Sequence, residues 1–239
     1  MNSKRDTLFQ RPRDHRDFQF DEAVAAVFPD MLRRSVPGYG MMLDGIRLIA
    51  RRHVARGARV YDLGCSLGAA SRAVIDGAPH ADYRLIAVDN AEAMIRRCRE
   101  RHRGLQPQPE WRHADIRDIE IEDASLVMLN LTLQFIPPEQ RLALLRRVRA
   151  GLRPDGLFLL SEKIRFQPPA VAEEMIELHH DFKRANGYSE LEIAAKREAL
   201  DKVLFPETLE HHRQRLAEAG FGRVQCWFQC FNFVSLLAW

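Results

Sequence analysis

A glycine-rich turn between two short apolar runs constrains the fold of this chain more than any other feature. The run RVYDLGCSLG spans residues 59–68, and LIAVDN follows at residues 85–90. Apolar run, glycine turn, helical stretch and second apolar run predict a strand–helix–strand unit within a parallel sheet. The turn is expected at the carboxyl end of the first strand, where ligands bind in sheets of this kind.

The residues of the turn also predict its ligand. Asp62 and Gly64 suit a sharp turn, and Gly68 allows backbone to come close to a ligand. Asp89 stands at a strand end, where an acid accepts hydrogen bonds from two ribose hydroxyls. Ser66 replaces the middle glycine of a dinucleotide fingerprint, and the loop lacks the Lys-Ser/Thr end of a phosphate-binding loop. We therefore expect a ligand with adenosine and ribose but no pyrophosphate.

Length and charge narrow the class of protein. The 239 residues suffice for one well-buried domain, and a net charge of +3 is too small to indicate nucleic-acid binding. No apolar run is long enough to span a membrane, and the Arg-rich start lacks the apolar core of a signal peptide. We expect a cytoplasmic protein. The basic run at residues 96–103 is expected to be a solvated helix end, with an RNA-facing patch as the alternative.

The cysteines and histidines do not favour a metal site. Cys226 and Cys230 lack the CxxC spacing of a zinc site, and no second pair of ligands follows. The adjacent histidines at 179–180 and 211–212 point to different faces of a helix, so neither pair forms a clamp. Four cysteines in a reducing compartment are expected to be free thiols, and no metal is expected.

Alternation of apolar strands with helical stretches predicts an α/β fold. We expect a doubly wound, mostly parallel seven-stranded sheet with a C-terminal antiparallel hairpin and a helical insertion. The strands are predicted at residues 59–64, 83–88, 110–114, 124–131 and 157–161, with the hairpin over 224–239.

One domain with five parts is predicted. They are an N-terminal arm at 1–20, N-terminal helices at 21–56, a cofactor-binding core at 57–165, a helical insertion at 166–205, and a closing helix and hairpin at 206–239.

Local signals add three expectations about these parts. Residues 1–18 have few apolar side chains and are expected outside the core. Pro29 is expected to end or kink the helix predicted over 20–34. Residues 151–156 are expected to form a turn.

Strand ends supply further candidate ligand contacts. Asp115 is expected to accept a hydrogen bond from an adenine amino group while Ile116 covers the ring; the alternative is an ordinary strand-end turn. Asn130 brings a polar group to where reacting atoms would sit, or is a satisfied loop amide. The alternative for Asp89 is a cap on the helix predicted over 91–103.

Arg197 is a cation on the apolar face of a predicted helix. The capping box at 189–192 starts this helix, and Ile193, Leu200 and Leu204 follow on the face that Arg197 shares. One interpretation is an aliphatic stem on apolar surface with its charge in water. The other is a guanidinium that points inward or toward a partner and binds a carboxylate with its two-pronged end. The pattern alone leaves both open.

Two resemblances follow from these motifs. Residues 62–68 with Asp89 resemble the cofactor site of class I S-adenosylmethionine-dependent methyltransferases, over about residues 40–165. Nearly the whole chain is similar to the carboxy-S-adenosyl-L-methionine synthase family, on the motifs at residues 28–31, 34–39, 60–70, 133–135, 160–163, 179–191 and 227–233.

The second resemblance implies a reaction other than methylation. Members convert S-adenosyl-L-methionine and prephenate into carboxy-S-adenosyl-L-methionine and phenylpyruvate. The product serves a tRNA carboxymethyltransferase, which builds 5-oxyacetyluridine at the wobble position. Members are homodimers, and neither direct nucleic-acid binding nor membrane contact is expected.

The resemblance also implies site residues. Arg197 is the expected catalytic residue, as the cation that binds the new carboxylate, acting within its own subunit or across a dimer. Carried over by motif, the ligand contacts are Tyr39, Gly64, Cys65, Ser66, Asp89, Asn90, Asp115, Ile116, Asn130 and Arg197.

Two other classes of protein remain open. The first is an ordinary methyltransferase that acts on a small molecule or RNA. The second is a binding protein that holds the cofactor without chemistry.

Overall fold

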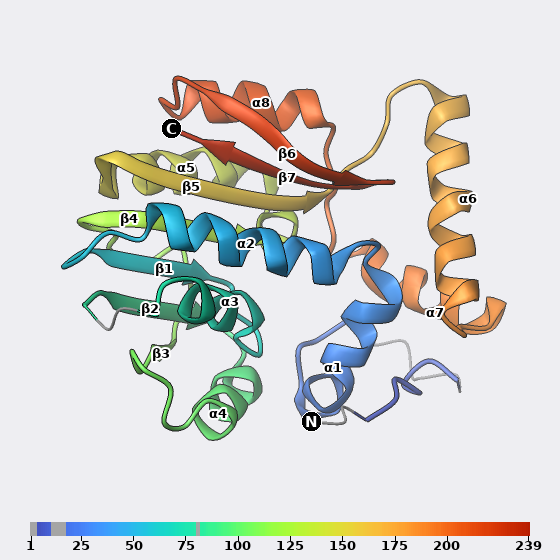
Figure 1. Ribbon diagram of the computed structural model, residues 1–239. Helices are drawn as coiled ribbons and strands as arrows, with labels where there is room; N and C mark the ends of the chain where they lie inside the picture. The colour runs from blue at the N-terminus through green and yellow to red at the C-terminus, as the bar shows by residue number, and fades with distance from the viewer. Residues whose placement is uncertain (1–3, 11–17, 80–81) are drawn as a thin grey trace.

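Figure 1 shows a computed structural model that describes residues 4–10, 18–79 and 82–239. A seven-stranded sheet forms its centre, in the order β3-β2-β1-β4-β5-β7-β6. The first five strands pair in parallel, and β7 runs antiparallel to both β5 and β6. This confirms the predicted fold class. The strands are β1 Arg59–Leu63, β2 Arg84–Asp89, β3 Glu110–His113, β4 Ala124–Asn130, β5 Leu152–Lys163, β6 Val224–Cys230 and β7 Phe233–Ala238.

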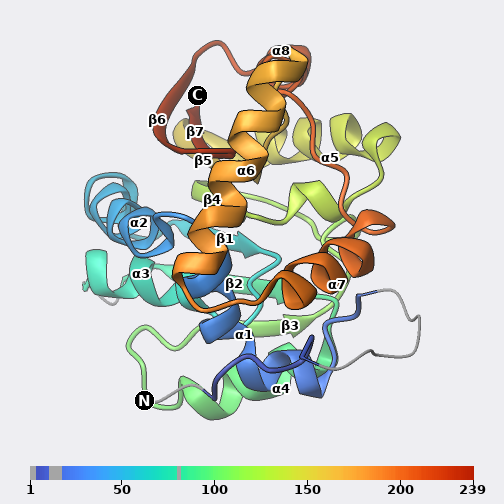
Figure 2. The ribbon, with the colours of Figure 1, turned by 90° about the vertical axis from the view of Figure 1, so that its right-hand side faces the viewer.

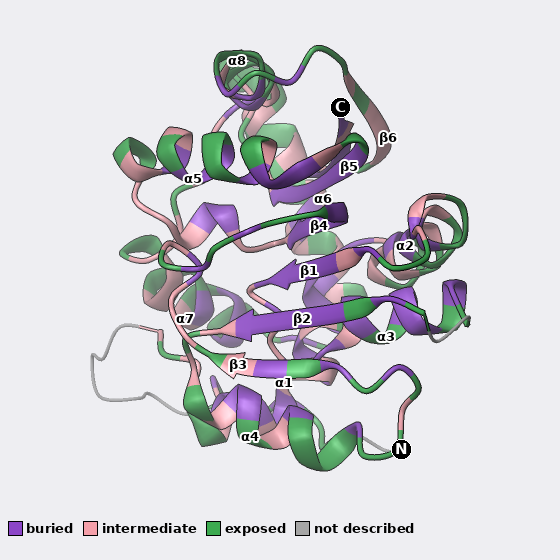
Figure 3. Cartoon of the chain, turned by 90° about the vertical axis from the view of Figure 1, so that its left-hand side faces the viewer, coloured by how far each residue is buried: buried purple, intermediate pink, exposed green. Residues whose placement is uncertain are grey.

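The sheet is covered on both faces, which explains why its central strands are apolar runs rather than alternating ones. Every residue of β4 except the last is buried, and Figure 3 shows the strands mostly in the buried colour. Helices α2 (Tyr39–His53) and α3 (Ala69–Gly77) pack on one face. Helices α5 (Pro138–Gly151) and α8 (Leu209–Glu218) pack on the other. Helix α4 (Glu92–Arg101) covers β2 and β3.

Strand β5 begins earlier than expected. Leu152 already pairs with Ala124 of β4, whereas residues 151–156 were predicted to be a turn. The register then shifts, and the next pair joins Leu126 to Leu157. The chain therefore forms a bulge within β5, between its pairs at Leu152 and Leu157. The residues that indicate a turn in the sequence do not distinguish such a bulge from a loop that precedes the strand.

Helix α1 (Glu22–Ser35) continues through Pro29, so the proline does not end it. Asp21 caps the helix by accepting a hydrogen bond from the amide of Val24 at 2.8 Å. Val24 and Met31, on either side of the proline, are both buried. This packing holds the helix together across the one hydrogen bond that proline cannot make.

The insertion forms two helices, α6 (Pro169–Ala185) and α7 (Glu190–Asp201), between β5 and α8. Ser189 caps α7 in a capping box with Glu192, as predicted. Figure 2 shows α6 and α7 standing across the edge of the sheet where β1, β2 and β4 end. The insertion therefore lies over the carboxyl ends of the parallel strands, where the ligand is expected.

The N-terminal arm packs against this insertion. The expectation that residues 1–18 lie outside the core is wrong for Asp6 and Phe9, which are buried; residues 1–3 and 11–17 lie outside the described residues. Asp6 accepts a 2.5 Å hydrogen bond from the hydroxyl of Tyr188. Its amide donates to Asp30 of α1. A polar residue thus anchors the arm, so counting apolar side chains did not reveal the contact.

Candidate active site

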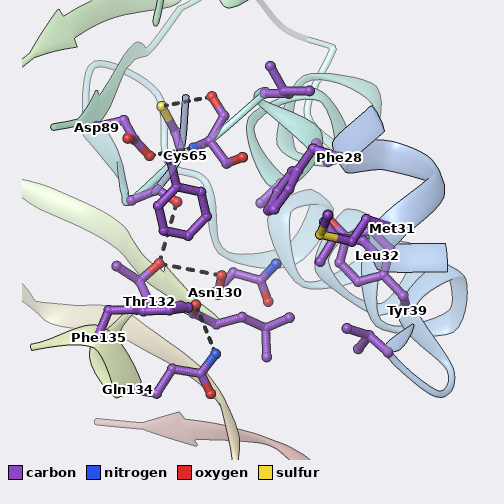
Figure 4. A pocket seen from close by; sticks show the side chains of 18 of the residues that line it. Phe28, Met31, Leu32, Tyr39, Cys65, Asp89, Asn130, Thr132, Gln134 and Phe135 are labelled. Atoms are coloured by element: carbon purple, nitrogen blue, oxygen red, sulfur yellow. Dashed lines mark hydrogen bonds between the residues drawn. The ribbon is translucent and has the colours of Figure 1, made fainter. Parts of the chain in front are cut away.

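A cavity of about 760 Å³ lies at the carboxyl ends of the parallel strands, a size that suits a nucleoside-sized ligand. Figure 4 shows it from close by. Asp89 and Cys65 lie on one side, Asn130 and Thr132 below them, and Tyr39 of α2 faces across from the other side. The wall thus combines strand ends of the sheet with the N-terminal helices.

The glycine turn after β1 shapes the floor of this cavity. The amides of Gly64 and Cys65 both donate to the carbonyl oxygen of Val88, at 2.8 and 2.9 Å. Gly64 has a φ of +81°, and a Cβ there would lie 2.2 Å from Cγ2 of Thr132. Only glycine fits both demands. The turn after β1 is therefore fastened to β2 and to the loop after β4.

Gly68 lies against protein side chains at the start of α3. It does not line the cavity, and a Cβ there would lie 2.6 Å from the Trp111 ring and 2.9 Å from the ring of His102. Its φ of +74° lets it begin α3 in a left-handed conformation. A close approach of these two side chains therefore requires glycine at this position.

Asp89 holds the turns on either side of it. One carboxylate oxygen accepts from the amide of Ser66 at 2.8 Å, and the other accepts from the amide of Ala91 at 2.9 Å. Burial raises the pKa of this carboxyl, and the two amide bonds oppose that rise. The N-cap of α4 is Ala91, so Asp89 is not the cap. Each oxygen accepts one of these bonds and can accept a second, and Asp89 lines the cavity, which suits the two hydroxyls of a ribose.

Asp115 and Ile116 lie beyond β3, also on the cavity wall. Arg117 donates to both oxygens of Asp115, at 2.9 Å from Nε and 2.5 Å from the terminal nitrogen. This pairing is the largest of the causes that lower the pKa of Asp115. The carboxylate therefore stays charged and fixed in direction, as an acceptor for an amino group should be.

Three polar groups converge beside β1 and β4. The side-chain oxygen of Asn130 is buried and has no hydrogen-bond partner within the described residues, and the same holds for Oδ1 of Asp62. The other oxygen of Asp62 accepts from the Ser71 hydroxyl at 2.6 Å. Burial raises the pKa of Asp62 to about 6, and burial with the nearby Asp62 charge raises that of Tyr39. Unpartnered acceptors that line a cavity are suited to ligand donors.

The structure brings all the predicted contact residues except Arg197 together around this cavity. Those lining it are Tyr39, Gly64, Cys65, Ser66, Asp89, Asn90, Asp115, Ile116 and Asn130. Arg197 is exposed on α7 and lines a separate shallow depression with residues that include His180, Glu190 and Asp201. Its charge still lowers the pKa values of Lys163 and Lys183, so it lies near the cavity without lining it.

Sequence reasoning missed the cationic end of the cavity. Lys163 at the end of β5, Lys183 of α6 and Lys196 of α7 all line the wall, together with His179. Lys183 and Lys196 are buried. His179 and Lys183 are four positions apart on α6, so they share a face, and that spacing is the signal that the sequence offered.

Aromatic rings cover the cavity from the N-terminal side. Phe20 packs edge-on against Phe28 of α1 and against Phe135, with ring centroids 5.8 and 5.4 Å apart. Phe135 belongs to a short 3₁₀ helix, η1 (Leu133–Phe135), after β4. The amide of Phe18 donates to the carbonyl of Ala199 on α7 at 3.2 Å. The arm and α7 together thus roof the site and restrict access of water.

Neither metal-binding clusters nor membrane-crossing helices occur in the described residues. Among them, no group of three or more His, Cys, Asp or Glu side chains is arranged to hold a metal ion. In the same part of the chain, no helix combines the length and the apolar character that crossing a membrane requires.

The fold and the site together define a class I methyltransferase-type protein. A family described as "Methyltransferase domain" matches residues 60–156. Human N-acetylserotonin methyltransferase in complex with SAM superposes with a TM-score of 0.61 at 15% identity, over 94% of this chain and 63% of that chain. Magnesium protoporphyrin IX methyltransferase from Synechocystis PCC 6803, with bound SAM, gives 0.55 at 17%, over 84% and 79%. At these identities the likeness establishes the fold alone.

Full-length relatives define the family. A protein from Geobacter sp. (strain M21) is 54% identical over 242 residues, covering 100% of this chain and 99% of the relative. One from Shewanella oneidensis is 52% identical over 241 residues, with the same coverage. Both are named carboxy-S-adenosyl-L-methionine synthase. This chain belongs to the carboxy-S-adenosyl-L-methionine synthase family.

Proposed function

We propose that this protein converts S-adenosyl-L-methionine and prephenate into carboxy-S-adenosyl-L-methionine and phenylpyruvate. The observation that carries the proposal is identity above half of all positions, over the full length, to relatives named for the carboxylated product. The cavity supports it, since one end suits adenosine and the other end is cationic. Prephenate has two carboxylates, so a cationic end is what it requires.

The order of the strands suggests where each part of the cofactor lies. Asp115 after β3 and Asp89 after β2 offer acceptors for the adenine amino group and the ribose hydroxyls. Asp62 in β1 offers a carboxylate to the ammonium group of the methionine part. Asn130 ends β4, so the sulfonium methyl group is placed there. The second substrate then lies toward β5, which is the next strand of the sheet.

The proposed chemistry balances without a metal or a redox cofactor. Positive sulfur makes the attached methyl group weakly acidic, and loss of a proton leaves an ylide. Prephenate loses CO₂ and hydroxide as its ring becomes aromatic, and the hydroxide takes the methyl proton to form water. The ylide carbon then bonds to CO₂, which gives the new carboxylate beside the sulfonium. The protein positions the two reactants and keeps water out while CO₂ is captured.

The decisive experiment incubates the purified protein with S-adenosylmethionine and prephenate. We expect phenylpyruvate to form, and mass spectrometry should find the cofactor heavier by one CO₂. An ordinary methyltransferase would form no phenylpyruvate and would leave the cofactor unmodified or demethylated. A binding protein would form neither product, so either result contradicts the proposal.

Arg197 is proposed to bind the new carboxylate across a homodimer. Its exposed position on α7 places it outside the cavity of its own chain. The apolar side chains of Val171, Ile176 and Leu191 on α6 and α7 are exposed too, which suits a surface that a second copy covers. A guanidinium from that copy then supplies a two-pronged partner for a carboxylate.

Mixing two inactive variants tests this arrangement. Arg197→Leu removes the cation, and Asp89→Asn disables the cofactor site. In a mixed dimer, action across the interface leaves one complete site, so subunit exchange should restore activity to about a quarter of the unmodified level. Action within one subunit leaves no complete site, and activity would stay at background. An Arg197→Leu protein that is fully active by itself would overturn the role altogether.

The product is proposed to supply a tRNA carboxymethyltransferase that modifies the wobble uridine. On this proposal the protein acts in the cytoplasm and binds no nucleic acid itself. A weak and shallow salt dependence of any tRNA association is expected, because the net charge is only +3.

A further inference from the structure

Two lysines at the cationic end of the cavity have no partner among the described residues. Lys163 and Lys183 both line the cavity, and within the described parts of the chain neither ammonium group makes an ion pair or a hydrogen bond. Lys196 differs, because it donates to the Ser35 hydroxyl at 2.9 Å and lies 4.0 Å from the Asp6 carboxylate. Lys196 is therefore satisfied by the protein, whereas the other two are not.

The surroundings fix both lysines at the cavity wall. Lys163 is the last residue of β5 and pairs across the sheet with Phe233. Its amide donates to the side chain of Gln134 at 2.9 Å. Lys183 lies one helical turn after His179, whose ring contacts the Ser35 carbonyl at 2.8 Å and Phe233 edge-on. The two ammonium groups thus come from a rigid strand and a packed helix.

Within the part of the chain that the structure describes, no carboxylate forms an ion pair with either lysine. Burial lowers the pKa of Lys183 to about 8, and the charges of Lys163 and Arg197 add to the shift. Burial and Arg197 also lower the pKa of Lys163, against a smaller opposite effect of Asp201. His179 is uncharged, since burial lowers its pKa to about 2. Two cations without partners among the described residues, Lys183 buried and Lys163 half-buried, cost stability, so their presence is explained by an anion that binds there.

We infer that Lys163 and Lys183 bind the carboxylate of the second substrate that is retained in the 2-oxo-acid product. The inference rests on the proposed function, and it identifies which charged group of that substrate meets which residues. Lys163 ends β5, which lies beyond β4 on the side away from β2 and β3, and Lys183 is close enough for the charge of Lys163 to lower its pKa further after burial. A carboxylate held there leaves the ring of the substrate between the lysines and the sulfonium.

The chemistry decides between the two carboxylates. The one on the ring loses its negative charge as it departs as CO₂. A cation bound to it would stabilise the starting state more than the transition state and would slow the reaction. The carboxylate of the oxo-acid side chain keeps its charge throughout, so binding it anchors the substrate without that penalty. The lysine pair therefore suits the retained group.

Methionine substitutions test the role, because they keep the aliphatic stem and remove the charge. Lys163→Met and Lys183→Met are each expected to raise the KM for prephenate roughly 10- to 100-fold. The affinity for S-adenosylmethionine should not change, and the melting temperature should stay equal or rise. Exposed Lys4→Met is the matched control with unchanged KM. Lys183→Arg should recover part of the loss, which a purely structural role would not predict.

Phenylpyruvate distinguishes the two carboxylates. It carries only the retained group, and it should inhibit competitively against prephenate, with its inhibition constant raised by the same factor in Lys183→Met. Unchanged inhibition in that variant would mean that the lysines bind the departing group, and an unchanged KM would mean that they bind neither; each result overturns the inference. Both readouts require product formation by the unmodified enzyme. Its absence would overturn the proposed function first, and the inference with it.

Discussion

The two ends of the cavity differ in whether their charged side chains have partners within the protein. At the adenosine end, Asp89 is fixed by two backbone amides, and Asp115 by Arg117, so the acidic groups are held in place before any ligand arrives. At the other end, Lys163 and Lys183 are left without partners within the described residues. Asp89 and Asp115 thus have protein partners, whereas Lys163 and Lys183 would be neutralised only by an anion. We interpret the end with Asp89 and Asp115 as a cofactor-binding site of a general kind. We interpret the end with Lys163 and Lys183 as the part that is specific to the proposed reaction.

Gly64→Ala is expected to damage the adenosine end most. The new Cβ would lie 2.2 Å from Thr132, at a φ of +81°. Strain and clash together should cost about 3 kcal/mol of unfolding free energy in urea titrations. Gly57→Ala separates the two causes, because its φ is +68° but nothing lies within 4 Å, and a loss of only about 1 kcal/mol is expected there. Equal losses in both variants would contradict the clash.

Asp89→Asn should weaken S-adenosylmethionine binding about 100-fold, as measured by calorimetry. An amide has one acceptor oxygen, so its NH₂ group must face either the amide of Ser66 or that of Ala91, and both are donors. The exposed Asp155→Asn provides a control at the far end of the sheet. Undiminished affinity in the Asp89 variant would show that the acid serves the turn alone.

The KM for prephenate should change with pH by up to about tenfold per pH unit, which is a smaller effect than that of Asp89→Asn on cofactor binding. The folded-state pKa of Lys183 is about 8, below its ordinary value of 10.5, and Lys163, Arg197 and neutral His179 face it. As pH rises through 8 the ammonium loses its proton, so the KM for prephenate should rise, while the KM for S-adenosylmethionine should not. Lys183→Met should lack this change. A rise of equal size in that variant would assign the titration elsewhere.

Deprotonation of Lys183 should have the opposite effect on stability: a rise in pH weakens prephenate binding but raises the free energy of unfolding of the unliganded protein. Because the folded form holds fewer protons than the unfolded form between about pH 8 and 10.5, this lysine's cost to the unliganded protein falls as pH rises through that window. The difference in unfolding free energy between Lys183→Met and the unmodified protein should therefore shrink with pH. A difference that grows would reverse the argument.

The smallest effect is expected where the arm is anchored. Tyr188→Phe removes the hydroxyl that donates to Asp6 at 2.5 Å and should cost about 1 kcal/mol. Asp6 keeps the amide of Leu8 as a partner, which limits the loss. Thermal melting measures it, and the affinity for S-adenosylmethionine should stay the same. A collapse of that affinity would mean that the arm shapes the adenosine end as well.

The adenosine end was predictable because its residues follow one another in a short stretch of sequence. The turn at 59–68, Asp89 and Asp115 each end a parallel strand, and a parallel sheet brings such ends to one edge. The capping box of α7 was equally local. Local periodicity could not decide whether the side of α7 that carries Arg197 is buried or exposed. The burial of that helix depends on its packing against α1, α6 and the arm.

The lysine end was predictable only in part, from the spacing of His179 and Lys183 on α6. Lys163, Lys183 and Lys196 come from three elements that pack together only in the folded chain. The same is true of Asp6, whose partner Tyr188 is 182 positions away. In the sequence these residues are seen only as lysines near the ends of helices and strands. Such lysines are ordinarily interpreted as charges exposed to water.

That long span has a consequence for the order in which the molecule is made. Strands β1 to β5 and the turns that hold Asp89 are complete once residue 163 has been synthesised. The arm already contacts Asp30 of α1, but its contacts to Tyr188 and α7 can form only after those residues have followed. A nascent chain therefore forms a place for a nucleoside before it has walls for a second reactant, and we expect the end of the cavity with Lys183 and Phe233 of β7 to be the last part of the site to form during synthesis.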